Sequence, residues 1–302
     1  MCKRKGFTLV ELLTVISIIS LLMAILLPVL HRVRRNAQAG VCQSNLRQWG
    51  IVFKMYTDEF DGQLISTTVE PAWYYPIREY YSNIAALLVC PSAKKPSNPE
   101  GRTAAPPYGG TFLSWGNFFT PVARPKWDTY GSYGLNHWAY KLNNQIGNEG
   151  GAWSGSSYSY SSDSNGTSYS YASSWSYASY VGDSTSQNDR YWRNAYVTNS
   201  NNVPLVFDGW WLYGYCNPDD QPPESDAIPR ADLSKQANHL CIDRHSKAIN
   251  SVFMDWSVRK VGLKELWVLK WHPQYNTAGP WTRAGGVRPE SWPKWLRNCK
   301  DY

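Results

Sequence analysis

The sequence predicts an α+β protein in which one long N-terminal helix packs on an antiparallel β-sheet domain with long loops. A long apolar segment begins near the N-terminus and passes into an amphipathic segment without a Gly-Pro break. Proline then recurs too often in residues 61–150 for another long helix. The last third of the chain holds short apolar runs that are typical of β-strands.

Residues 7–30 form the apolar segment. As a helix it would extend about 36 Å, which exceeds the roughly 30 Å hydrocarbon core of a bilayer. Thr14, Ser17 and Ala24 recur on one face, and such small side chains let helices approach closely in lipid. Pro28 is expected to loosen the helix near its end. The segment is therefore predicted to span a membrane.

Charged residues near this segment carry specific information. The basic residues 3–5 precede it and keep that end cytoplasmic. Glu11 lies within it, where a charge costs roughly 2.5–3.5 kcal/mol at a helix centre and is expected to be functional. A secretory signal is cleaved after its apolar core, whereas the Gly6-Phe7 junction precedes this one. Cleavage there would remove residues 1–6 and leave the helix on the mature chain.

The helical pattern continues through residues 31–60. Apolar side chains recur every three or four positions with Arg, Gln and Lys between them, so one face suits a core. Asp61-Gly62 is expected to end the helix. Further along, residues 77–89 are predicted to form one short helix, and residues 130–142 a strand or extended core segment.

Residues 154–185 are dominated by Ser, Tyr and Gly. Their composition fits a disordered linker, but the alternation of Ser and Tyr on both sides of Asn165-Gly166 favours a β-hairpin. The hairpin would place four tyrosines on one face: Tyr158, Tyr160, Tyr169 and Tyr171.

The C-terminal third is predicted to be an antiparallel meander. Residues 203–211 indicate one strand, residues 240–245 and 251–256 a further pair, and residues 257–262 the strand that follows. Residues 264–271 indicate a short helix or an edge strand. The remaining tail is rich in Pro, Trp and Gly and is expected to wrap the surface.

The residues from Gly6 to Leu13 (GFTLVELL) resemble the processing site of type IV pilins and type II secretion pseudopilins. The resemblance implies that prepilin peptidase cuts between Gly6 and Phe7 and methylates the new Phe7 amine. It also implies that Glu11 offsets the charge of that amine on a neighbouring subunit during assembly. Pro28 falls where many pilins carry a helix-loosening proline.

The resemblance implies a structural subunit of a type IV pilus or a type II secretion pseudopilus. Its parts would be a cleaved leader (1–6), a transmembrane helix (7–30), its amphipathic continuation (31–60) and an extracytoplasmic β-rich domain (61–302). Implied partners are pilin or pseudopilin subunits in a helical filament, prepilin peptidase and an inner-membrane assembly platform. The chain would cross the inner membrane once and then enter a periplasmic or cell-surface filament.

Composition narrows the alternatives. The net charge is +7, but no Lys/Arg stripe follows residue 60, so no nucleic-acid partner is predicted. Trp (16) and Tyr (21) outnumber Phe (8), which fits cross-strand packing or a face that binds glycans. A membrane-tethered module that binds glycans or another surface partner is therefore the alternative function. No Gly-x-Ser-x-Gly, phosphate-loop or His-Glu-x-x-His motif occurs, and an enzyme is not predicted.

Five cysteines would remain after leader removal, so at least one stays unpaired. A bridge between Cys42 and Cys90 would tie the helix to the domain and contribute roughly 3–4 kcal/mol in the chain-entropy model. A second pair, Cys216 with Cys241, would leave Cys299 free. The alternative is that all five are buried thiols.

A second resemblance lies around His245, Asn250 and Asp255. It is to the H-x9-DG signature of a group of prepilin-type proteins, with Trp256 in place of the glycine. Other elements of that group are matched at Cys42, Asn45 and Leu46, at Cys90-Pro91, and at Tyr133, Gly134 and Asn136.

Asp208 and Asp255, together with His245, are the candidate metal ligands. Pseudopilins often carry calcium in their C-terminal loops, so calcium is the ion that the resemblance suggests. Calcium prefers six to eight oxygen ligands, however, and histidine suits it poorly. A hydrogen bond between His245 and Asp255 that fixes a hairpin is therefore the expected role, and metal binding or catalysis is the alternative.

Overall fold

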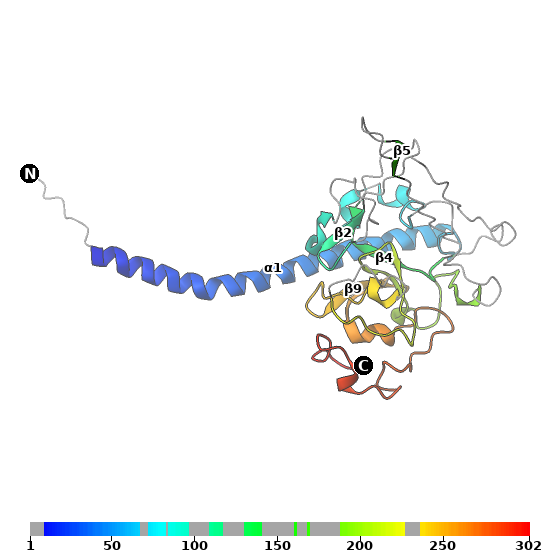
Figure 1. The fold of residues 1–302 in the computed structure, drawn as a ribbon. Coiled ribbons are helices and arrows are strands. Elements are labelled where there is room, and N and C mark those ends of the chain that lie inside the picture. The colour runs from blue at the N-terminus through cyan, green and yellow to red at the C-terminus, as the bar shows by residue number, and fades with distance from the viewer. Residues whose placement is uncertain are drawn as a thin grey trace, which may run out of the picture.

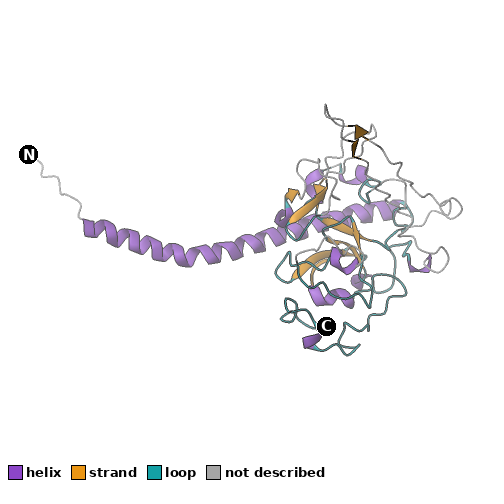
Figure 2. Ribbon diagram, viewed as in Figure 1, coloured by secondary structure: helices purple, strands orange, loops and turns teal. Residues whose placement is uncertain are grey.

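The computed structural model describes residues 9–66, 72–82, 84–96, 109–116, 130–140, 160–161, 168–169, 188–226 and 236–302. It confirms the α+β layout, with one long helix, α1 (Leu9–Glu59), packed on a β-sheet domain (Figure 1). The first half of α1 projects away from the domain, and the second half runs along its strands (Figure 2).

The apolar half of α1 is long and apolar enough to cross a membrane, and none of that stretch is buried. The helix continues through Pro28 without a break, so the expected loosening does not interrupt it. It ends at Glu59, and Asp61 (φ 51°) and Gly62 (φ 79°) then take the left-handed conformation. The Gly62 amide donates a hydrogen bond to the carbonyl of Thr57 (2.7 Å), which confirms the predicted stop.

The central sheet has five strands in the order β10-β9-β7-β4-β8. Strands β4 (Tyr133–Asn136), β7 (Pro204–Asp208), β9 (Ala248–Phe253) and β10 (Val258–Gly262) pair antiparallel, as predicted. Strand β8 (Tyr213–Gly214) pairs parallel with β4. Every residue of β4, β7 and β9 is buried. The sheet is therefore covered on both faces, with α1 packed along β9.

Two smaller sheets lie within the described residues. Strands β1 (Lys95–Pro96), β2 (Leu113–Gly116) and β3 (Tyr130–Gly131) form one of them. Strands β5 (Tyr160–Ser161) and β6 (Ser168–Tyr169) pair antiparallel with Tyr160 opposite Tyr169, which agrees with the predicted hairpin. Tyr158, Tyr171 and the rest of 154–185 lie outside the described residues.

Two predicted elements are wrong. Residues 77–89 hold two 3-10 turns, η1 (Arg78–Tyr81) and η2 (Ala85–Leu88), because Ser82 takes a left-handed conformation (φ 50°) that stops a helix. Residues 240–245 do not form a strand. Ser246 (φ 55°) and Lys247 (φ 57°) turn the chain sharply, and the strand begins only after them.

The other short helices are 3-10 turns. Leu263–Trp267 (η8) is a short 3-10 helix, which agrees with the short-helix alternative predicted for residues 264–271. The rest are η3 (Pro91–Ala93), η5 (Asn188–Arg190), η6 (Ser200–Asn202), η7 (Gln236–His239) and η9 (Pro289–Ser291). The C-terminal tail does more than wrap the surface, because it buries Trp292 against Trp267 (ring centroids 5.4 Å apart).

Candidate functional site

The N-terminal half of α1 is the first candidate site. Its large apolar side chains are exposed along the described stretch from Leu9 to Leu30. Glu11 lies on this surface, close to the start of the described helix. Thr14 and Ser17 turn their hydroxyls back to the carbonyls of Glu11 (3.0 Å) and Leu13 (2.7 Å). An apolar surface of this extent requires lipid or other helices to cover it.

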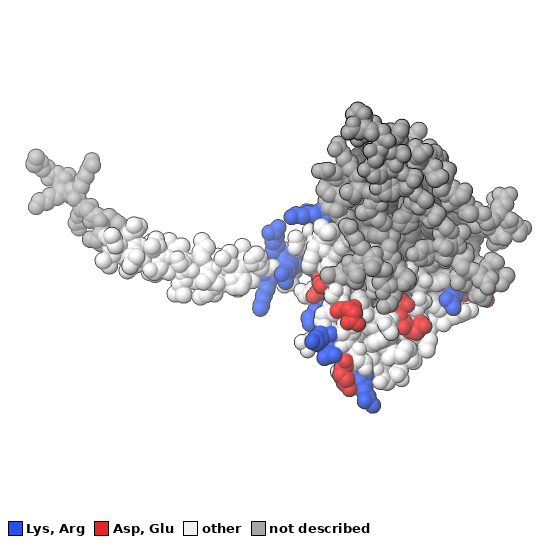
Figure 3. Space-filling view, viewed as in Figure 1, with Lys and Arg blue, Asp and Glu red and all other residues white. Residues whose placement is uncertain are grey.

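A basic belt separates this surface from the domain. Arg32, Arg34 and Arg35 follow the apolar stretch and are exposed, and Lys and Arg side chains gather where the helix meets the domain (Figure 3). Gly6 and Phe7 lie outside the described residues, so the cleavage and methylation site stays a prediction.

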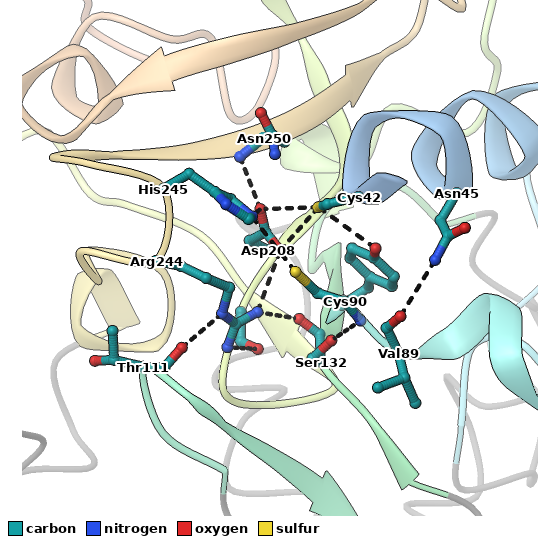
Figure 4. Close-up of polar contacts among 12 residues, drawn as sticks. Cys42, Asn45, Val89, Cys90, Thr111, Ser132, Asp208, Arg244, His245 and Asn250 are labelled. Carbon is teal, nitrogen blue, oxygen red and sulfur yellow. Dashed lines mark hydrogen bonds and ion pairs between the residues drawn. The ribbon is translucent and has the colours of Figure 1, made fainter. Parts of the chain in front are cut away.

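The second candidate site is a buried polar cluster where α1 crosses the sheet. Cys42 comes from α1, Cys90 precedes η3, Asp208 ends β7, and His245 lies just before β9 (Figure 4). All four side chains are buried, and their sulfur, oxygen and nitrogen atoms lie within 4.8 Å of one another. Four chain segments that are far apart in the sequence thus meet at one point.

Asp208 is at the centre of this cluster. Its carboxylate lies 3.1 Å from Nε2 of His245 and accepts a hydrogen bond from the Cys42 thiol (3.4 Å). The backbone N–H of Asn250 donates to Asp208 Oδ2 (2.8 Å). Cys90 Sγ lies 3.4 Å from His245 Nε2. The Tyr133 hydroxyl donates to Cys42 Sγ (3.4 Å), which closes the network on the helix side.

Arg244 supplies the positive charge beside Asp208. Its guanidinium is completely buried and lies 3.2 Å from Asp208 Oδ1. Its other N–H groups donate to the carbonyls of Thr111, Ser132, Gly110 and Gly209, so all five donors have acceptors. A buried guanidinium is tolerated only with such partners.

Burial and neighbouring polar groups shift the pKa values of all four side chains of the cluster. Burial opposes charge on Asp208, but His245 and Arg244 outweigh it and lower the pKa of the carboxyl to about 2. Burial opposes charge on His245 too, but Asp208 raises the pKa of the imidazole to about 9. Burial raises the pKa of Cys42 well above its ordinary value. The pKa of Cys90 falls to about 6 because hydrogen bonds from Cys42 and His245 outweigh burial.

The structure separates the predicted metal ligands. Asp208 and His245 meet, but Asp255 lies in the exposed turn between β9 and β10, where it accepts hydrogen bonds from the backbone (3.0 Å) and hydroxyl (2.6 Å) of Ser257. The predicted His245–Asp255 hydrogen bond is wrong, because the length of β9 lies between the two residues. Within the described residues the cluster offers one carboxylate, which does not suit calcium.

All five described cysteines are free thiols, so neither predicted disulfide is present in the structure. Cys42 and Cys90 do come together, but as members of the polar cluster. Cys216 and Cys241 are buried, and Cys299 is half-buried. The alternative of five buried thiols agrees with the structure at four positions, and Cys299 is the exception because it is half-buried.

Sequence reasoning missed Arg244 and did not assemble the cluster. A signal was nevertheless present, because the separate elements of the second resemblance converge. Cys42, Cys90, Tyr133 and His245, each taken from a different element, contact the same buried cluster. Placing these matched residues together would have located the site.

Comparison with known proteins supports the N-terminal interpretation. Residues 1–27 match the family model described as the prokaryotic N-terminal methylation motif. No curated protein and no solved structure matches the chain. The match does not extend to the motif around His245. The chain thus carries the N-terminal motif of prepilin peptidase substrates on a long apolar helix, as type IV pilin-like proteins do.

Proposed function

We propose that the chain is a structural subunit of a type IV pilus or a type II secretion pseudopilus, assembled through α1 after prepilin peptidase cleavage. The observation that carries this proposal is the fully exposed apolar half of α1 joined to the methylation motif. Before assembly that surface lies in the inner membrane. In a filament the same surface of neighbouring subunits covers it.

Glu11 would set how far each helix is shifted along its neighbour in the filament. A carboxylate in an apolar helix bundle is costly unless it is paired, and the methylated Phe7 amine of the next subunit supplies the opposite charge. Because Phe7 and Glu11 are different positions of the chain, the contact between subunits would be head-to-tail. Contacts of this type continue from subunit to subunit and build a helical filament on the inner-membrane assembly platform.

Replacing Glu11 tests this role. Glu11→Ala should leave membrane insertion unchanged and reduce filament yield strongly, because the Phe7 amine loses its counter-charge. Fractionation measures insertion, and shearing of cells followed by immunoblotting measures filaments. Glu59→Gln, at the other end of the same helix, is the control and should assemble normally. Normal filament yield with Glu11→Ala would contradict charge pairing.

Processing gives an independent prediction. Mass spectrometry of the membrane-extracted chain should find an N-terminus at Phe7 with one added methyl group. Gly6→Val should block both changes, because a side chain at Gly6 would hinder the approach of the peptidase to the backbone. An intact Met1 terminus on the wild-type chain would remove the basis of the pilin proposal.

The glycan-binding alternative receives less support. Eight tryptophans of the described residues are at most 3% exposed: Trp49, Trp73, Trp115, Trp138, Trp210, Trp267, Trp271 and Trp292. Their large rings fill the core, which agrees with the packing interpretation of the aromatic composition. Binding of the chain to a polysaccharide that is lost on Tyr169→Ala would instead support a glycan-binding face.

A further inference from the structure

We propose that Cys42, Cys90, Asp208 and His245 bind one structural zinc ion that fastens α1 to the sheet of its own domain. The inference stands on the buried cluster alone and is independent of filament assembly. The four residues are the best-placed metal ligands among the described residues, since each directs one ligand atom at a common centre (Figure 4).

The spacing of the ligand atoms fits tetrahedral zinc. With Zn–S bonds of about 2.3 Å and Zn–N or Zn–O bonds of about 2.0–2.1 Å, a tetrahedral ion holds its ligand atoms roughly 3.3–3.8 Å apart. The carboxylate of Asp208 lies 3.1 Å from His245 Nε2 and 3.4 Å from Cys42 Sγ. Cys90 Sγ lies 3.4 Å from His245 Nε2. All four ligand atoms lie within 4.8 Å of one another, so around an ion the closest pairs would move slightly apart and any pair wider than about 3.8 Å would draw together.

The ligand types select the metal. Two sulfurs and one imidazole nitrogen are soft or intermediate ligands, which favour zinc over magnesium or calcium. Asp208 adds one oxygen, which zinc accepts. The site is closed, because all four ligands come from the protein and the side chains of Asp208 and His245 are at most 1% exposed. Closed four-ligand zinc sites are structural rather than catalytic.

The charge of the surroundings fits a bound dication. Two thiolates, one carboxylate and a neutral imidazole around Zn²⁺ leave one negative charge, and the buried guanidinium of Arg244 neutralises it. Zinc binds thiolates and a neutral imidazole, so any protons on these ligands leave to solvent as the ion enters.

Neighbouring groups already hold the ligands in place. The backbone N–H of Asn250 and the Arg244 guanidinium each hydrogen-bond one oxygen of Asp208 and so fix the carboxylate. The Tyr133 hydroxyl points at Cys42 Sγ, and the Ser132 hydroxyl accepts a hydrogen bond from the Cys90 amide. Such outer contacts orient metal ligands before the ion arrives.

The test uses the full-length mature chain, purified in detergent with a thiol reductant. Elemental analysis after zinc addition and dialysis should find about one zinc ion per chain. Removing it with a strong chelator should lower the melting temperature, because an ion that binds the folded state stabilises it. Cobalt in place of zinc should give thiolate-to-cobalt charge-transfer absorption and the intense visible bands of tetrahedral cobalt.

Cys90→Ser should lose the zinc and the thiolate-to-cobalt absorption. Cys241→Ser is the matched control, because it also replaces a buried thiol but lies outside the cluster, and it should keep both. Equal zinc content in Cys90→Ser and wild type would overturn the proposal. The cobalt spectrum of the wild-type chain requires no variant, and its failure to show thiolate ligation would overturn the proposal even if Cys90→Ser does not fold.

A disulfide is the competing fate of the two thiols. Alkylation of free thiols in intact cells, followed by peptide mass spectrometry, distinguishes the two. Free Cys42 and Cys90 in zinc-containing protein would support the site. A Cys42–Cys90 disulfide in native protein that lacks zinc would overturn it.

Discussion

Trp256 holds an unfavourable backbone conformation in the turn between β9 and β10. Its φ is 68°, in the left-handed region, where a side chain meets the neighbouring carbonyl and costs about 1–2 kcal/mol. Its amide donates to the carbonyl of Phe253 (2.9 Å), which fixes this conformation. The H-x9-DG signature carries glycine at this position, and the observed φ gives a physical reason for it.

Because of this conformation, glycine should be more stable than alanine at position 256, the reverse of the usual order. Trp256→Gly should be more stable than Trp256→Ala by about 1 kcal/mol, because both lose the indole but only glycine relieves the backbone. Urea unfolding of the purified chain measures the difference. The same pair of substitutions at Ser257, where φ is negative, should show the usual order with alanine more stable. Equal stabilities at Trp256 would contradict the strain.

Residue-level prediction from sequence succeeded where chemistry is local. The Asp61-Gly62 stop depends on neighbouring backbone and was predicted correctly. The partner of His245 was not, because Asp255 is close to it in sequence while Asp208 is close to it in space. Pairing across a sheet is set by strand register, which a single sequence does not specify.

At the scale of elements, α1 docks through a regular set of hydrogen bonds. Gln38, Asn45 and Trp49 lie on one face of the helix and donate side-chain hydrogen bonds to three alternate carbonyls of the segment 87–91. The distances run from 3.4 Å at Pro91 through 3.2 Å at Val89 to 2.9 Å at Leu87. Side chains of the helix therefore provide hydrogen-bond donors for three backbone carbonyls of an irregular, partly buried segment.

Two glycines of α1 differ in what surrounds them. A Cβ at Gly50 would lie 3.1 Å from Val252 Cγ2 and 3.4 Å from the carbonyl oxygen of Trp256, whereas a Cβ at Gly40 would have nothing within 4 Å. Gly50 thus permits the close approach of α1 to β9, and Gly40 has no such role in the described structure.

Leucine at each position tests this difference. Gly50→Leu should reduce the free energy of unfolding by about 2 kcal/mol or more, because the side chain forces helix and sheet apart. Gly40→Leu should leave it unchanged or raise it by up to about 1 kcal/mol, since leucine favours helix. Thermal unfolding followed by circular dichroism measures both. If Gly50→Leu were as stable as Gly40→Leu, the close contact of Gly50 with Val252 and Trp256 would not limit the side chain at this position.

Elements with a sustained sequence pattern were predictable. The apolar and amphipathic periodicities identified α1, and alternation about Asn165-Gly166 identified the pairing of β5 with β6. Residues 77–89 were predicted as a helix, yet Ser82 takes a left-handed conformation that splits them into two turns. That conformation depends on tertiary packing, and propensity alone does not reveal it.

At the scale of the whole molecule, buried neutral histidines make stability depend on pH. Burial lowers the pKa of His239 and of His272 to about 4. The unfolded chain takes up these protons below about pH 6.5, whereas the folded chain resists them until about pH 4. The contribution of these two histidines to folding stability is therefore complete above about pH 6.5 and is lost as the pH decreases to about 4.

Urea unfolding at a series of pH values checks this expectation, in chelator-treated protein so that metal loss does not contribute. His239→Gln should flatten the fall between about pH 6.5 and 4. The same substitution at His31, exposed on α1, controls for the loss of a histidine elsewhere. A wild-type stability that stays constant across this range would contradict the buried neutral state of the two histidines.

The fold class of the whole molecule was predictable because it follows from patterning, but the cluster was not. Cys42 and Asp208 are 166 positions apart, and Cys90 and His245 are 155 apart. Motif resemblance marked most of these residues, yet only the three-dimensional course of α1 across β7 and β9 brings them together.

The continuity of α1 has a mechanical consequence. In the filament proposed above, tension would enter each subunit along the helix axis. Trp49 and Phe53 on the embedded half lie fully inside the core, so the pull loads the helix–sheet contacts in shear, all at once, instead of peeling them apart in turn. If the chain assembles as proposed, the domain should separate from α1 only when its own hydrophobic core ruptures.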